Sequence, residues 1–69
     1  MTNLEWNAGI EFLINAKVGD YVEHLGRTVT VENMCGGRYL CLNEDNDVVG
    51  LAETEIGAMA FLRFGKIGG

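Results

Sequence analysis

The chain has 69 residues, no proline, and ten acidic side chains against five basic ones, which gives a net charge of −5. This charge repels a phosphate backbone and the five cations are dispersed along the chain, so a basic protein partner is favoured over direct binding of nucleic acid. The 69 residues include neither a secretory leader nor an apolar run long enough to span a membrane, and two cysteines cannot build a disulfide framework. A single cytoplasmic domain over residues 1–69 is therefore predicted, and so short a chain would gain stability from self-association.

The first predicted element is a helix from about Asn3 to Ala16. Thr2 and Glu5 match a capping box, in which each side chain accepts a hydrogen bond from the backbone amide of the other residue. At helical spacing the apolar side chains form two stripes, one of which can cover a sheet. The first stripe consists of Trp6, Ile10, Leu13 and Ile14, and the second of Leu4, Ala8, Phe12 and Ala16.

The second stripe leaves two interpretations open. Either the core takes up both stripes, or the stripe around Leu4, Ala8 and Phe12 pairs with a second copy of the chain. These three residues are therefore the candidate homodimer interface. Binding to a membrane surface needs a cationic polar face, and this helix offers only asparagine and glutamate there.

Residues 18 to 52 predict a four-stranded antiparallel meander. Tight turns are expected at Leu25-Gly26, Gly36-Gly37 and Asp45-Asn46, because glycine, asparagine and aspartate tolerate the backbone conformations of short hairpins. In the expected register Val22 lies opposite Val29. Leu42 lies between Val31 on one neighbouring strand and Val49 on the other, and Leu40 lies between Asn33 and Leu51 in the same way. In this register Tyr39 lies on the outer face, and one inward face collects the aliphatic side chains. The expected core set is Val22, Val29, Val31, Leu40, Leu42, Val49 and Leu51.

A short motif in this region carries a resemblance. The segment Val18-Gly19-Asp20-x-Val22, a later glycine, the strand Thr28 to Val31, the run Gly37 to Cys41 and Glu55-Ile56 together resemble small SH3-like barrels of bacteria and phages. The likeness covers roughly residues 17 to 56. It implies a strongly bent meander that closes toward a barrel, and little about activity, since such barrels serve as protein-binding, nucleic-acid-binding and assembly modules.

The last element is predicted to be a short helix. Glu53 and Glu55 place negative charge where a helix begins, and Gly65 can cap its end. Ile56, Met59, Ala60 and Phe64 have helical spacing, whereas the alternation within residues 58 to 64 leaves a strand open. The prediction is an α+β fold with an N-terminal helix, a strongly bent four-stranded antiparallel meander (SH3-like barrel) and a short C-terminal helix.

Two patterns lack parts that a metal site needs. The run Asn43-x-Asp45-x-Asp47 alternates as calcium ligands do, but Val48 and Thr54 stand where a calcium loop needs glycine and glutamate. The two cysteines and the single histidine, His24, lack the paired spacing of a zinc site, and Cys41 is expected on the outer face of the sheet. No catalytic residue, metal or cofactor is predicted.

Acidic side chains gather between positions 44 and 55. They are Glu44, Asp45, Asp47, Glu53 and Glu55. Such a run is either a solvated face or a surface that steers the protein onto a basic partner, including one that normally holds nucleic acid. The leading hypothesis is a non-catalytic, homodimeric protein-binding module, most concretely a phage-type inhibitor of a host nucleic-acid machine, in the manner of an anti-CRISPR or a polymerase inhibitor.

Two alternatives use other features of the chain. The terminal Gly68-Gly69 resembles the end of ubiquitin-like and sulfur-carrier proteins, whose last glycine is activated as an adenylate. Those proteins start with a hairpin and carry a helix in mid-chain, whereas this chain starts with a helix. The resemblance to SH3-like barrels also allows a nucleic-acid-binding module, which the negative charge disfavours.

Overall fold

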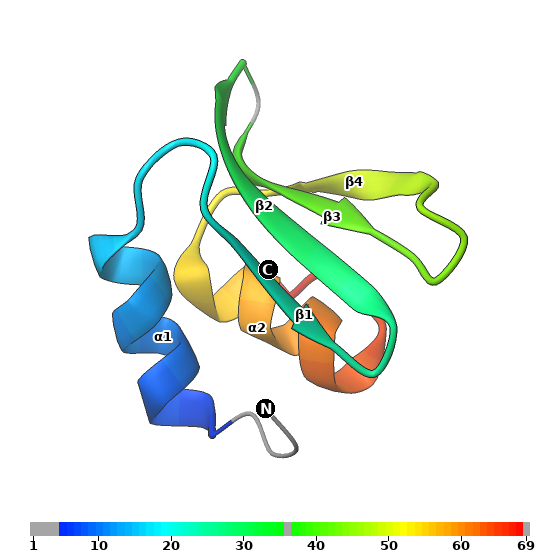
Figure 1. Ribbon diagram of the computed structural model, residues 1–69, viewed down its shortest axis with the longest axis horizontal. Helices are drawn as coiled ribbons and strands as arrows, with labels where there is room; N and C mark the ends of the chain where they lie inside the picture. The colour runs from blue at the N-terminus through cyan, green and yellow to red at the C-terminus, as the bar shows by residue number, and fades with distance from the viewer. Residues whose placement is uncertain (1–4, 36, 69) are drawn as a thin grey trace.

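The computed structural model describes residues 5–35 and 37–68, which form two helices and a four-stranded sheet (Figure 1). In chain order the elements are α1 (Trp6–Asn15), β1 (Tyr21–His24), β2 (Arg27–Met34), β3 (Gly37–Leu42), β4 (Val48–Ala52) and α2 (Glu55–Phe64). The antiparallel strands follow one another in the sheet, which confirms the α+β class and the meander. Within the described residues the edge strands β1 and β4 do not pair, so the sheet is open and closure into a barrel is not confirmed.

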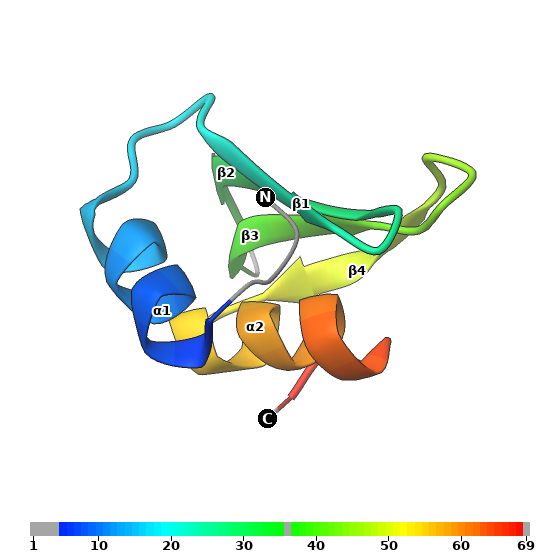
Figure 2. The same ribbon diagram turned by 60° about the horizontal axis from the view of Figure 1, so that its bottom comes forward.

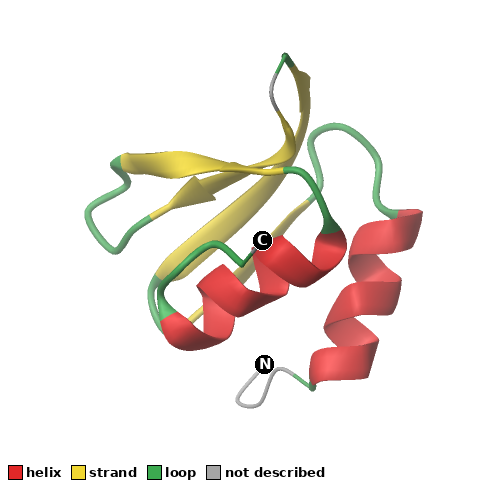
Figure 3. Ribbon diagram, turned by 180° about the vertical axis from the view of Figure 1, so that it is seen from behind, coloured by secondary structure: helices red, strands yellow, loops and turns green. Residues whose placement is uncertain are grey.

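The core lies between the sheet and α2. Helix α2 runs beneath the inner face of the sheet, and α1 lies beside α2 and packs on it, so that neither helix covers the outer face (Figures 2 and 3). The buried apolar side chains come from three parts of the fold. They are Leu13 of α1 and Ala16 just after it, Val29, Val31, Tyr39, Cys41 and Ala52 of the sheet, and Ala58, Met59, Phe61 and Leu62 of α2. No side chain in the described part of the chain has a buried polar atom that lacks a hydrogen-bond partner.

The first hairpin has the predicted register. Val22 lies opposite Val29, and His24 pairs with Arg27 across a two-residue turn. The turn residues Leu25 and Gly26 have φ angles of 53° and 82°, the positive values that a type I′ turn requires at both positions. The prediction for this pair of strands is therefore confirmed, including the half-buried position of Val22 against the core.

The second hairpin has a different register, and the predicted core face of β3 is wrong. Gly37, a predicted turn residue, pairs instead with Met34 at the start of β3, and a bulge between Val31 and Met34 shifts the ladder once more. Leu42 consequently pairs with Thr28 and not with Val31. Because the total shift is an odd number of residues, every β3 side chain exchanges faces. The inward side chains of β3 are Tyr39 and Cys41, and the outward ones are Leu40 and Leu42.

Helix α1 is shorter than predicted, and it packs against the core through Trp6, Ile10 and Leu13 of its predicted first stripe. It begins at Trp6, and Glu5 at the N-cap makes no side-chain hydrogen bond, so the predicted capping box does not form at Glu5. The predicted partner Thr2, the start at Asn3 and the stripe residue Leu4 lie outside the described residues. Leu13 is fully buried, whereas Ile14 of the same predicted stripe is 56% exposed because it points away from α2.

Helix α2 confirms the predicted helix, so the strand alternative is wrong. The Thr54 hydroxyl accepts a hydrogen bond from the Gly57 amide at 3.0 Å, and Gly65 ends the helix in the left-handed conformation at φ 84°. The buried face includes Met59 of the predicted set but not Ile56 or Phe64. Ile56 and Phe64 are 59% and 69% exposed, while Phe61 and Leu62 lie in the core. Apolar residues recur at helical spacing on both sides of this helix, so the sequence pattern allows either side to be buried. The contact of α2 with the sheet decides which side is buried.

Tyr39 joins three elements of the fold. Its side chain is fully buried, and its hydroxyl lies 3.2 Å from the Leu13 carbonyl oxygen of α1 and 2.5 Å from Glu55 Oε2 of α2. The hydroxyl carries one hydrogen, so it donates to one of these acceptors at a time. Burial raises the pKa of Tyr39 to about 12, and the hydrogen bond to the Glu55 carboxylate adds to the rise. The folded protein therefore keeps the Tyr39 phenol neutral to a higher pH than the unfolded chain does.

Candidate protein-binding site

The connection between β3 and β4 is a fixed loop. The predicted two-residue turn is wrong, because Asn43 pairs with Asp47 through an N–H to carbonyl bond of 3.0 Å and three residues lie between them. The Asn46 amide donates to the Asn43 carbonyl at 3.0 Å, and Asn46 has a positive φ of 63°. The Asn43 side-chain oxygen accepts from the amides of Asp45 and Asp47 at 2.9 and 3.0 Å. The Asn43 side chain thus holds the loop in one conformation by accepting hydrogen bonds from backbone amides within it, as asparagine commonly does in turns.

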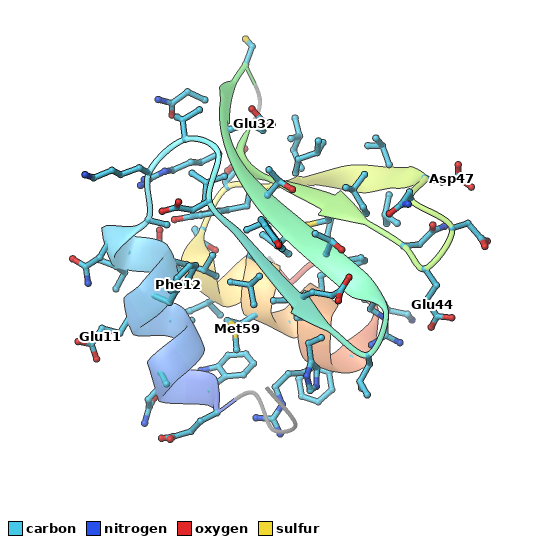
Figure 4. The ribbon with its side chains drawn as sticks, in the orientation of Figure 1. Glu11, Phe12, Glu32, Glu44, Asp47 and Met59 are labelled. Carbon is cyan, nitrogen blue, oxygen red and sulfur yellow. The ribbon has the colours of Figure 1, made fainter. Side chains whose placement is uncertain are left out.

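This loop displays three carboxylates to solvent. Glu44, Asp45 and Asp47 are exposed, and Figure 4 shows Glu44 and Asp47 at the tip of the hairpin with their carboxylates directed outward. Among residues 5–35 and 37–68 no group of three or more His, Cys, Asp or Glu side chains is placed to hold a metal ion. The loop is an acidic surface held by its own backbone hydrogen bonds.

Two exposed valines follow the acidic loop. Val48 pairs with Leu42 and Gly50 pairs with Cys41, so Val49 is the extra residue of a β-bulge. Val48 is 63% exposed and Val49 is 49% exposed, which contradicts the predicted core position of Val49. We call Glu44, Asp45, Asp47, Val48 and Val49 the hairpin patch. The signal for it in the sequence is the direct succession of loop acids and β-branched residues, but the assumed turn assigned Val49 to the core.

The remaining predicted partner residues lie elsewhere. Glu53 and Glu55 follow β4, at the end of that strand opposite to the acidic loop (Figure 1). Glu53 is exposed, whereas Glu55 is half-buried and accepts the hydrogen bond from Tyr39. The five acidic residues therefore do not share one surface, and Glu55 has a role within the fold.

Three of the five basic side chains are engaged by the two helices. Arg27 donates to the Leu62 carbonyl oxygen at 3.2 Å near the C-terminus of α2, and Arg38 donates to the Ala16 carbonyl oxygen at 2.5 Å just after α1. Both positions are favourable for a cation because helix C-termini carry partial negative charge. Arg63 lies with its guanidinium carbon 6.0 Å from the centroid of the Trp6 ring. The guanidinium groups of these three side chains are thus held against helices, although Arg27 and Arg38 belong to β2 and β3.

The thiols occupy different environments. Cys41 lies opposite Val29 in the core, on the inner face and not on the predicted outer face, and burial raises its pKa to about 11. A buried thiol that stays protonated is a poor nucleophile and a poor metal ligand. Cys35 is exposed beside the second turn. His24 pairs with Arg27 next to the first turn, where the sequence places it.

The predicted dimer residues that the structure describes lie on an exposed face of α1. Ala8 is exposed and Phe12 is 45% exposed, while Leu4 lies outside the described residues. Ala8 and Phe12, together with Ala16 and three polar side chains, line a hollow of about 420 Å³. The second stripe of α1 is thus not taken up by the core, except for Ala16.

The end of the described chain is docked on α2. The Gly68 amide donates to the Gly57 carbonyl oxygen at 3.2 Å, and Ile67 packs against the core beside β4. Gly69, the residue that a carrier protein would activate, lies outside the described residues. A carrier needs a tail that extends away from its domain, so the docked Gly68 does not favour that alternative.

Gly57→Ala is expected to release this tail. A Cβ at position 57 would lie 2.6 Å from the Gly68 carbonyl oxygen, closer than real contacts allow. The helix itself gains about 1 kcal/mol from alanine, so α2 stays and the tail moves. We expect the Gly68 amide to exchange about tenfold faster with solvent, as the loss of one hydrogen bond predicts, measured by NMR. Ile67→Ala is the control, because it removes packing of the tail without altering α2. A Gly68 amide that exchanges with solvent as slowly in Gly57→Ala as in the unaltered chain would contradict the expectation.

Neither described helix is both long and apolar enough to cross a membrane. Comparison with protein-family models, with curated proteins and with solved structures found no match.

Proposed function

We propose that this chain is a non-catalytic protein-binding module that uses the hairpin patch to dock onto a basic surface of a protein that handles nucleic acid. One observation carries the proposal: three exposed carboxylates and two exposed valines stand together at the end of one hairpin. An apolar centre with a polar rim is typical of protein interfaces. The loop is already closed by Asn43, so little conformational entropy is lost when it binds.

The distribution of charge supports a basic partner. The acidic loop carries three exposed carboxylates and no cation of its own, and the guanidinium of Arg27, next to the β1–β2 turn, donates to α2. Complementary charge accelerates association and selects against acidic partners. A strongly basic protein surface is the kind that binds phosphate backbones. Occupation of that surface by the hairpin patch would compete with nucleic acid.

The most concrete form of this function is a small inhibitor of the phage type, which covers the phosphate-binding surface of a host nucleic-acid machine. The net charge of −5 on only 69 residues supports this form. The homodimer expected from the sequence through Leu4, Ala8 and Phe12 is not part of this proposal, because Ala8 and Phe12 lie on α1 and not on the hairpin patch. Closure of the meander into an SH3-like barrel is likewise not needed for the hairpin patch to bind.

Charge reversal at two matched pairs of positions tests the proposal. Glu44→Lys with Asp47→Lys alters the hairpin patch, and Glu5→Lys with Glu53→Lys alters exposed acids elsewhere, so the two double variants have the same net charge. We expect the unaltered chain to capture basic nucleic-acid-binding proteins from a cell extract, and excess DNA to displace them. The first double variant should retain less than about a tenth of the captured protein, since like charges at an interface cost several kcal/mol.

The control double variant should capture the same proteins as the unaltered chain. Equal loss in both double variants would show that net charge alone decides binding and would refute the hairpin patch as the site. Capture of acidic or uncharged proteins that DNA does not displace would refute the basic partner.

A further inference from the structure

The outer edge of β1 offers unpaired backbone groups. In an antiparallel pair the residues alternate between those that hydrogen-bond to the neighbouring strand and those that point away from it. His24 flanks the two-residue turn and faces β2, and the Asp20 carbonyl accepts from the Val31 amide at 2.8 Å, so the even-numbered residues of this stretch face β2. Tyr21 and Glu23 therefore direct their N–H and carbonyl groups outward, where no further strand pairs with β1 among residues 5–35 and 37–68.

A hollow borders this edge. It has a volume of about 420 Å³ and lies between α1 and the residue that precedes β1. Ala8, Phe12 and Ala16 supply its apolar lining, and Glu11, Asn15 and Asp20 its polar lining. In Figure 1 helix α1 stands on the side of the sheet where β1 is the edge strand, and it packs on α2, part of which lies between the two. A free strand edge with an apolar hollow beside it is a place where an extended segment gains both backbone hydrogen bonds and side-chain burial.

We propose that the groove between α1 and β1 binds an extended, basic segment of a partner protein, which adds to the sheet as a further strand beside β1. The backbone of Tyr21 and Glu23 would bond to the added strand. Its inward side chains, which alternate with the outward ones, would fill the hollow against Phe12. This groove lies on the opposite side of the molecule from the hairpin patch (Figure 4) and binds independently of the proposed function.

The charges around the groove decide between a basic segment and a second copy of the chain. Glu11 and Asp20 line the hollow, and the exposed Glu23 stands on the strand edge itself. A second copy docked by the same groove would bring these carboxylates against their own counterparts, which is unfavourable. Lys or Arg side chains on the outward side of an added strand would instead lie beside Glu23, which is on the outer face because Val22 packs against the core. The segment we infer therefore alternates small apolar residues, which point inward, with basic ones.

A synthetic peptide of alternating lysine and valine is the probe. We expect it to shift the NMR signals of the Tyr21 and Glu23 amides and to slow their exchange with solvent. In a strand all valine amides point to one side and all lysine amides to the other. Methylation of the peptide nitrogens at one of these two sets should therefore abolish binding, and methylation at the other should leave it in place.

Variants of the chain test the same contacts. Glu23→Pro removes an N–H that faces away from β2, so the β1–β2 ladder keeps its bonds and edge strands tolerate proline there. We expect the peptide to bind about tenfold more weakly to it, and less than about threefold more weakly to Glu23→Gln, which keeps the N–H. Phe12→Ala should weaken binding, whereas Ile14→Ala, on the same helix but outside the hollow, should not.

Three results would overturn the inference. The peptide could shift the signals of Glu44 and Asp47 in place of those of Tyr21 and Glu23. The two methylated peptides could bind equally well or equally poorly. Sedimentation could show a dimer that Phe12→Ala dissociates, in which case a second copy fills the groove.

Discussion

Leu13→Ala is expected to lower the free energy of unfolding by about 2–5 kcal/mol, the cost of removing a fully buried leucine side chain. Leu13 is 0% exposed and is the side chain through which α1 enters the core. Small domains have total stabilities of only about 5–15 kcal/mol. A loss of this size should therefore leave a measurable unfolded fraction at room temperature, or detach α1 from α2. Urea denaturation followed by circular dichroism measures the change.

The neighbouring Ile14 provides a matched control. It is 56% exposed on the same helix, so Ile14→Ala should change the free energy of unfolding by less than about 0.5 kcal/mol. Equal effects of the two substitutions would mean that α1 does not dock on α2 through Leu13. A larger effect of Ile14→Ala would mean that the packed face of α1 is the other one.

Alkaline pH is expected to destabilise the fold. Burial raises the pKa of Tyr39 from 10.0 to about 12 and that of Cys41 from 9.0 to about 11. The unfolded chain releases these protons at lower pH than the folded chain does, so the stability is complete below pH 9 and falls as the pH rises toward 12. A difference of about two pKa units corresponds to roughly 2–3 kcal/mol for each group. Urea denaturation at a series of pH values from 8 upward gives the slope.

Single substitutions at Cys41 and Tyr39 show how much of the alkaline loss of stability each residue causes. Cys41→Ala should remove the part between about pH 9 and 11, and Tyr39→Phe the part between about pH 10 and 12. Both variants also cost stability at neutral pH, so the informative quantity is the slope with pH and not the absolute value. Absorbance of the phenolate in the unaltered chain, compared with that in Tyr39→Phe, follows the Tyr39 phenol directly. A slope unchanged in the double variant would contradict the assignment.

Local patterns in the sequence were sufficient to predict the elements but not the way in which β2 and β3 meet. A turn at Leu25-Gly26 sets Val22 opposite Val29, so the first hairpin was predictable in register, although Leu25 takes a positive φ that leucine rarely adopts. Gly36-Gly37 leaves the position of the turn ambiguous by one residue, and nothing in the side chains marks the bulge before Met34. Alternation with period two then gives an equally regular pattern on either face of β3.

The same ambiguity hid part of the candidate site. The assumed turn at Asp45-Asn46 placed Val49 in the core, although the acids beside it were correctly expected to be exposed. Glu55 shows the opposite error, because a carboxylate at a helix start was interpreted as surface charge and instead accepts a hydrogen bond from Tyr39. That contact joins residues 16 positions apart and depends on the face that Tyr39 occupies.

The bulge at Val49 also separates what the fold requires from what evolution can change. The pairs on its two sides, Leu42 with Val48 and Cys41 with Gly50, stay aligned with each other whichever side chain the bulged residue carries. Position 49 is therefore open to substitution with little loss of stability. A lineage that encountered a new partner would be able to alter recognition there, in single steps and without repacking Tyr39 or Cys41.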